Sequence, residues 1–197
     1  SFSAANFSSF LSLYIKEIKK GLPYGNLEIQ DFKMKSPADE YVLNNLELQL
    51  SPADGLSELK MHSDFATIYL KGDLAPNSIK RYGDYLVAHY FADSIKSQNI
   101  NTKDLKDWHL SAQIKKTDIL HKLLNFPLST SGTFSIEGNL QPQKEYLYLS
   151  SYCQGMNYDN IELLELRLFL QGKEKQLISL VQAKKPTAQS QIQVSLS

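Results

Sequence analysis

The chain has 197 residues, and its lysines and arginines equal its aspartates and glutamates at 21 each. This length can bury one substantial hydrophobic core, and a zero net charge provides no long-range attraction for nucleic acid, so we expect no nucleic-acid partner. The single cysteine, Cys153, excludes an internal disulfide and a cysteine-rich zinc site. No run approaches the roughly 20 apolar residues that a membrane-spanning helix needs.

The first predicted element is an amphipathic helix over about residues 7–20. Its apolar residues recur at helical spacing, Asn6 can cap the start, and Lys19 and Lys20 suit the negative end of the helix dipole before Gly21. Alternating apolar and polar residues, separated by turn signals, then predict four strands that form a meander. These strands cover about residues 26–34, 41–50, 56–63 and 65–74.

A second helix is predicted over about residues 78–97, with Ile79, Tyr82, Leu86 and Tyr90 on the stripe that faces the sheet. A strand follows around Trp108–Ile114, and then a short helix that begins near Thr117 and ends before Pro127. The rest of the chain is predicted to be strands, at about 132–140, 145–153, 158–170, 175–183 and 190–196. The last of these alternates up to the final residue, so we expect a longer parent chain.

Short strand patterns recur along the chain. Tyrosine precedes an Asn-aliphatic-Glu-aliphatic run in three places, within residues 24–29, 41–48 and 158–163, and residues 67–74 resemble residues 133–140. Gly72 and Gly138 occupy matching places in this second pair, which predicts a similar strand-end or bulge geometry for both. Reuse of one strand pattern is typical of stacked β-hairpins in an extended sheet.

Together these elements predict a β-rich α+β fold: one extended, curved, mainly antiparallel sheet, an open tube or half-barrel, with two substantial helices and one short helix packed against it. Residues 1–197 are interpreted as a single segment of a longer β-repeat protein. Its possible sub-units are a helix plus meander over 1–75, a helical and connecting part over 76–127, and a second meander over 128–197.

Several of the later strands lack a clean polar face. The apolar alternation of residues 161–170 changes parity at Leu163-Leu164, which predicts a β-bulge there. Apolar residues on both faces of a strand are usually covered by a helix or a second sheet, and the other interpretation is an open apolar concavity that holds a ligand. The residues that we place on such a concave face are Leu164, Leu166, Leu168, Leu170, Phe134, Ile136 and Leu140.

No arrangement of residues predicts catalysis, a cofactor or a metal. The four histidines are far apart in the sequence, and Cys153 has no basic neighbour that would activate it. The recurring carboxylates Glu28, Glu47 and Glu162 alternate with aliphatics, which places them on a solvated face. The eleven tyrosines fit cross-strand packing, or a face that stacks against sugars.

Residues 120–140 combine a short predicted helix, an aromatic-Pro-Leu sequence, small residues with Gly, and a strand that ends in Gly-x-Leu. This segment resembles the recurring unit of the AsmA-like proteins, and most closely the TamB-type subunits of the translocation and assembly module. The resemblance implies a periplasmic segment of an inner-membrane-anchored protein from a Gram-negative bacterium. The strands of that family form a long curved tube.

The apolar inner face of such a tube is implied to carry lipid acyl chains between the two membranes, or to assist outer-membrane protein assembly with a barrel assembly protein. The family provides no catalytic or position-specific lipid-binding residues, so the concave-face residues named above come from alternation alone. The alternative function is a structural or adhesive β-module that binds protein or glycan through a tyrosine-bearing face.

Overall fold

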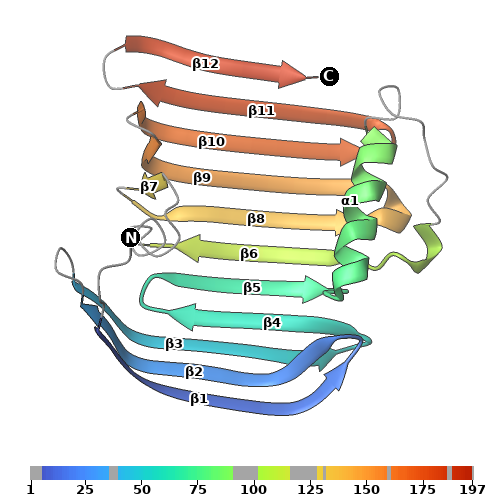
Figure 1. Ribbon diagram of the computed structural model, residues 1–197. Coiled ribbons are helices and arrows are strands. Elements are labelled where there is room, and N and C mark those ends of the chain that lie inside the picture. Colours follow the sequence, from blue (N-terminus) through green and yellow to red (C-terminus); the bar gives the residue numbers. More distant parts are fainter. Residues whose placement is uncertain are drawn as a thin grey trace.

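The computed structural model describes residues 6–35, 40–90, 102–115, 128–130, 132–158, 161–185 and 188–196. Within these residues all strands join one antiparallel sheet, in the order β1-β2-β3-β4-β5-β6-β8-β9-β10-β11-β12, and the short β7 pairs with β9 outside this path (Figure 1). The sheet is therefore a continuous meander from the first strand to the last. The bounds are β1 (Asn6–Lys19), β2 (Leu22–Lys35), β3 (Glu40–Ala53), β4 (Leu56–Ser63), β5 (Ala66–Gly72), β6 (Trp108–Ile114), β7 (Leu128–Thr130), β8 (Phe134–Gln141), β9 (Tyr146–Tyr158), β10 (Ile161–Lys173), β11 (Gln176–Lys185) and β12 (Ala188–Leu196).

The predicted helix over residues 7–20 is wrong, because this segment is the edge strand β1. Its pairing with β2 shifts register twice, between Ser8 and Phe10 and between Ile15 and Glu17. Each shift breaks the two-residue alternation, so the apolar residues of β1 follow a spacing that also fits a helix. The many aromatic and β-branched residues of this segment favour a strand, and pairing with β2 decides between the two.

One α-helix, α1 (Pro76–Tyr90), is present among the described residues, so the predicted fold with two substantial helices is wrong. Pro76 occupies the start of the helix, where a missing N–H costs nothing, and the Asp73 carboxylate accepts a 2.7 Å hydrogen bond from the Ser78 hydroxyl. The predicted continuation to residue 97 and the short helix after Thr117 lie outside the described residues. The other helical pieces are two single 3₁₀ turns, η2 (Thr102–Asp104) and η3 (Pro142–Lys144).

The remaining strand predictions are confirmed, with bounds that differ by a few residues. The predicted meander of four strands corresponds to β2 through β5, the predicted strand around Trp108–Ile114 is β6, and the five strands after residue 130 are β8 through β12. Residues with positive φ form the hairpin turns at Lys20-Gly21, Asp54-Gly55 and Glu174. Local alternation and turn residues therefore specify these elements.

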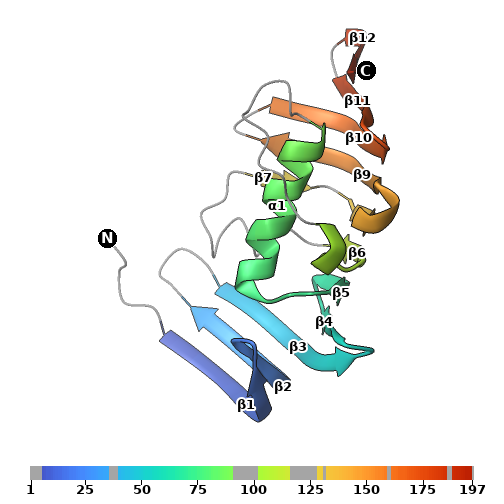
Figure 2. The ribbon, with the colours of Figure 1, turned by 90° about the vertical axis from the view of Figure 1, so that its right-hand side faces the viewer.

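The sheet bends so that β1, β2 and β3 curl toward α1, which lies on the concave side (Figure 2). Tyr82 and Tyr85 of α1 form a buried cluster with Leu105 and Leu140. A second cluster joins Tyr24, Leu50 and Leu74 where the sheet curls. Trp108 packs against both clusters, and its indole ring lies 5.0 Å from the Tyr82 ring, measured between centroids.

The hydroxyl groups of α1 attach the helix to the loops at one end of the strands. Tyr82 donates to the Lys106 carbonyl at 2.9 Å and accepts from the Lys106 N–H at 2.8 Å. Tyr85 donates to the Pro142 carbonyl and Tyr90 to the Glu145 carbonyl, each at 3.4 Å. The helix is therefore held both by apolar packing and by backbone groups of the η2–β6 and β8–β9 connections.

Replacing Tyr82 with Phe is expected to lower the free energy of unfolding by about 1–3 kcal/mol, because both backbone groups of Lys106 lose their partner beneath the helix. Urea denaturation followed by circular dichroism measures this loss. Tyr14→Phe is the matched control, since Tyr14 is 62% exposed on β1 and should lose almost nothing. An equal loss in the two variants would contradict the role of the Lys106 contact.

The stability of the fold is expected to fall above pH 10. Burial raises the pKa of Tyr85 to about 12, and burial also raises the pKa of Tyr82 and of Tyr90. The folded state therefore holds the Tyr85 proton over a range where the unfolded chain, with a tyrosine pKa of about 10, releases it. This contribution is complete below pH 10 and is lost between about pH 10 and pH 12.

The measurement compares urea unfolding of the wild-type chain and of Tyr85→Phe at pH 9 and pH 11. Between these pH values the free energy of unfolding should fall by about 1 kcal/mol more in the wild type than in the variant. An identical pH dependence would show that the Tyr85 hydroxyl ionises as freely in the folded state as in the unfolded chain.

Candidate functional site

The concave face of the sheet carries parallel lines of apolar side chains. Strand register places residues directly opposite one another from β3 to β11, so each line crosses the strands at right angles. The central line consists of Leu48, Met61, Ile68, Ala112, Ile136, Ser151, Leu168 and Val181. None of these residues is charged.

Two further lines flank the central line, and they also contain no charged residue. The line on the side of α1 consists of Leu50, Leu59, Leu70, Leu110, Gly138, Leu149, Leu170 and Ser179. The line on the other side consists of Leu46, Ser63, Ala66, Ile114, Phe134, Cys153, Leu166 and Ala183. We call these three lines the concave apolar face.

The opposite, convex face is polar along the same strands. Glu28 and Glu47 lie opposite each other there, and His62 follows on β4. The predicted solvated positions of Glu28 and Glu47 are therefore confirmed. Continuing the same line gives Thr67, Gln113, Ser135, Tyr152, Arg167 and Gln182. Along this line, from β2 to β11, the convex face is therefore polar where the concave face is apolar.

Among the described residues, α1 covers one end of the concave side. It lies across one end of the strands in Figure 1, above a line made of Trp108, Leu140, Leu147, Gly172 and Leu177. In the central line, Leu48, Met61, Ile68, Ile136 and Leu168 remain partly exposed. Large apolar side chains on this face therefore keep access to solvent.

Glycines make room for the aromatic rings at the covered end. A Cβ on Gly72 would lie 2.7 Å from the Trp108 ring, and one on Gly172 would occupy the place of the Tyr90 hydroxyl. Gly72 ends β5, whereas Gly138 lies inside β8, and neither has positive φ. The two glycines of the repeated pattern share an extended backbone on the concave face, and the predicted bulge occurs at neither.

Six of the seven residues predicted for the concave face lie on it. Phe134 and Leu166 belong to one line, Ile136 and Leu168 to the next, Leu170 to the third, and Leu140 faces α1. β9 lies between β8 and β10. The predicted residues of β8 therefore do not pair directly with those of β10.

Leu164 is separate from the other six. It is 50% exposed and lines a mainly polar pocket at the far end of β9 and β10 with Ser129, Gln154 and Asn157. The register of β10 on β9 is the same before and after Leu164, so the predicted bulge inserts no extra residue there. The irregularity is instead at Gly155, where φ is 74°.

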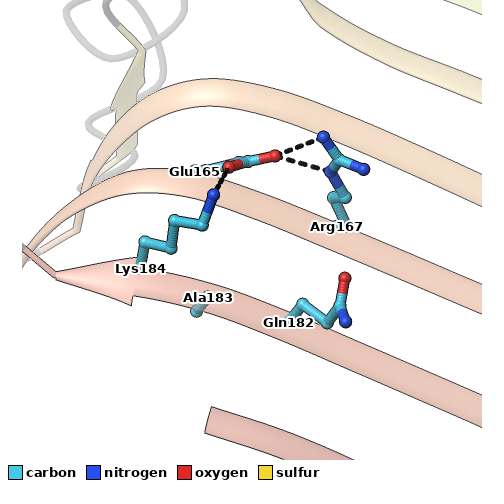
Figure 3. Close-up of a pocket in the computed structure, with 5 residues that line it drawn as sticks. All are labelled: Glu165, Arg167, Gln182, Ala183 and Lys184. Atoms are coloured by element: carbon cyan, nitrogen blue, oxygen red, sulfur yellow. Dashed lines mark hydrogen bonds and ion pairs between the residues drawn. The ribbon is translucent and has the colours of Figure 1, made fainter. Parts of the chain in front are cut away.

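A charged cluster occupies the convex surface of β10 and β11 (Figure 3). Glu165 accepts hydrogen bonds from Arg167 and Lys184, each at 2.6 Å, and lines a shallow pocket with these residues, Gln182 and Ala183. The bond from Lys184, ahead of the bond from Arg167, holds the pKa of Glu165 below its usual value. Both cations already face one carboxylate, so the cluster offers little for an anionic ligand.

The aromatic residues of the convex face already contact one another across strands. The ring centroids of Tyr69 and His109 lie 5.6 Å apart, and those of Tyr148 and Phe169 lie 5.8 Å apart with the rings edge-on. The Arg167 guanidinium carbon lies 5.3 Å from the centroid of the Tyr152 ring. These contacts fit the cross-strand packing expected of the tyrosines. Cys153 is fully buried, and burial raises the pKa of its thiol, so the geometry does not favour a nucleophile.

Within the described ranges, no three His, Cys, Asp or Glu side chains gather where a metal ion could bind. In the same part of the chain, no helix is long and apolar enough to cross a bilayer. Comparisons with protein-family models, curated proteins and solved structures find no match. The concave apolar face is therefore the surface feature of the described residues that points most directly to a function.

Sequence reasoning missed most of this face. Residues on β3, β4, β5, β6, β9 and β11 complete the three lines, and the alternation of β3 to β6 was visible in the sequence. Alternation does not specify which residues of neighbouring strands lie opposite each other, because this register depends on the turn between each pair of strands. Tyr85 was missed as well: it is 2% exposed, whereas Ile79, predicted on the buried stripe, is 52% exposed.

Proposed function

We propose that the concave apolar face binds lipid acyl chains, and that the chain is a non-catalytic periplasmic segment of a protein that bridges two membranes. The observation that supports lipid binding is the separation of polarity: three uncharged lines on the concave face, with partly exposed leucines and isoleucines, lie opposite a polar convex face. A soluble protein seldom leaves a large contiguous apolar surface exposed without a partner for it.

The shape of the face fits a long, thin, apolar ligand. Neighbouring strands lie about 4.8 Å apart, so a line from β3 to β11 extends over about 34 Å. This compares with a hydrocarbon core of about 30 Å for a whole bilayer, of which one acyl chain spans about half. The ligand would lie across the strands and beside α1, and each buried methylene would contribute about 0.8 kcal/mol.

The periplasmic location, the inner-membrane anchor and an outer-membrane barrel assembly protein as partner are supported by the resemblance of residues 120–140 to the AsmA-like proteins. Lipid binding is supported by that resemblance and, independently, by the concave apolar face. The two parts of the proposal can therefore fail separately.

Titration with a dansyl-labelled fatty acid tests lipid binding. Trp108 is the only tryptophan of the chain and lies beside the concave apolar face, because it packs against the same buried cluster as Leu70. A bound probe should quench Trp108 by energy transfer, and unlabelled oleic acid should displace it. A purified protein that neither binds the probe nor yields lipid on solvent extraction would contradict the proposal. Binding of glycan or protein without lipid would favour the tyrosine-bearing face instead.

A further inference from the structure

α1 runs across the strands, parallel to the lines of the concave apolar face. Near its start Ser78 donates to Asp73, just after β5, and at its end Tyr90 lies against Gly172 of β10. From Ser78 to Tyr90 the helix rises about 18 Å, and the strand spacings from β5 to β10 add to about 19 Å. The helix axis is therefore nearly perpendicular to the strands.

An ion pair shows which flank of α1 faces the open part of the concave side. Arg81 lies 3.9 Å from Asp104 of η2, measured between nitrogen and oxygen atoms. η2 lies beyond the ends of the strands, on the other side of α1 from the open part of the sheet (Figure 1). Ile79 and Gly83 are each two residues from Arg81, which places them on the opposite side of the helix. The flank that faces the open sheet, which we call the inward flank, consists of Ile79, Gly83, Leu86 and Val87.

The inward flank is apolar and accessible. Ile79 is 52% exposed and Val87 39%, and Leu86 is partly exposed. A Cβ added to Gly83 would meet nothing within 4 Å among the described residues. Glycine is a poor helix former, and neither positive φ nor packing against a described neighbour requires it at this position. Gly83 therefore leaves space beside an apolar wall, at a cost to the helix.

The sheet supplies a second wall next to this space. It is the line on the side of α1, which contains no charged residue and whose leucines Leu70, Leu110, Leu149 and Leu170 are partly exposed. We infer that one unbranched acyl chain lies along α1, in the corner between the inward flank and this line, and that Gly83 leaves the room for it. This inference rests on the proposed lipid binding and specifies where the ligand lies.

The dimensions and polarity of the corner fit this ligand. One acyl chain spans about half of a 30 Å hydrocarbon core, or about 15 Å, and α1 offers about 18 Å from Ser78 to Tyr90. Neither wall carries a charge that an ionic ligand could pair with. A chain in the corner would contact apolar side chains on two sides, and so would bury more of its surface than a chain on the open sheet.

Titration of Gly83→Leu with the dansyl-labelled fatty acid, followed by the quenching of Trp108, tests the inference. The added side chain would occupy the corner, so the dissociation constant should rise at least about tenfold. Leucine is the better helix former, so the melting temperature should not fall. Asp84→Leu is the matched control: it adds the same side chain to an exposed position about 100° further round the helix, away from the corner, and it should bind the probe as the wild type does.

A contact measurement locates the chain directly. A bimane label on Ile79→Cys should be quenched by a nitroxide-labelled stearic acid, whereas the same label on Asp84→Cys should not; Cys153 is fully buried and should stay unlabelled. A wild type that does not bind the dansyl probe would overturn the proposed function together with this inference. If the wild type binds, equal affinity in Gly83→Leu or equal quenching of the two labels would overturn this inference alone.

Discussion

Replacing Leu168 with Asp is expected to weaken binding of the dansyl-labelled fatty acid strongly while the chain remains folded. Leu168 lies in the central line between Ser151 and Val181 and is partly exposed. In the free protein a carboxylate at this position can stay hydrated, but a bound acyl chain would remove that water. Because burial of an unpaired charge costs several kcal/mol, the affinity should fall by at least about tenfold, which corresponds to 1.4 kcal/mol.

The matched control is Ile178→Asp, which places the same charge on the convex face of β11. It should bind the probe as the wild type does. Circular dichroism during heating separates the two interpretations of the concave apolar face. An unfolded Leu168→Asp variant would show that these leucines form a sealed core, and the structural or adhesive function would then be preferred. Equal binding by Leu168→Asp and Ile178→Asp would place the ligand elsewhere.

Replacing Trp108 with Ala is expected to cause the largest loss of stability, about 3–5 kcal/mol. Trp108 packs against both buried clusters, and through them it joins α1 to the curled part of the sheet. Gly72 leaves the space that the indole occupies, and as a glycine it has no side chain of its own to fill the cavity. We expect α1 to lose its support, because Tyr82 also contacts this ring.

Urea denaturation followed by circular dichroism measures this effect, since the variant has no tryptophan fluorescence. Tyr152→Ala is the comparison: Tyr152 is 37% exposed on the convex face, and its loss should be well below that of Trp108→Ala. Trp108→Phe should recover much of the stability, because an aromatic ring would still separate the two clusters. A small loss in Trp108→Ala would show that α1 is held mainly by its hydrogen bonds to Lys106, Pro142 and Glu145.

Beyond the strand positions confirmed above, alternation placed the aliphatics of β8 and β10 on one face. That part of the concave apolar face was predicted because a strand places every second side chain on the same side. Leu164 follows the same parity but lies apart from the others, near the irregular backbone of Gly155.

The sequence by itself determined where most strands lie and that consecutive strands form a meander, because alternation, turn residues and short connections are local properties of the chain. Only the tertiary structure decided the state of residues 6–19, because their apolar spacing satisfies a helix as well as a strand with shifted register. Tertiary packing also decided which side of α1 is buried and that β5 and β6, which α1 separates in the sequence, pair with each other. These outcomes depend on contacts between residues far apart in the chain, such as Tyr85 with Pro142 and Trp108 with Gly72.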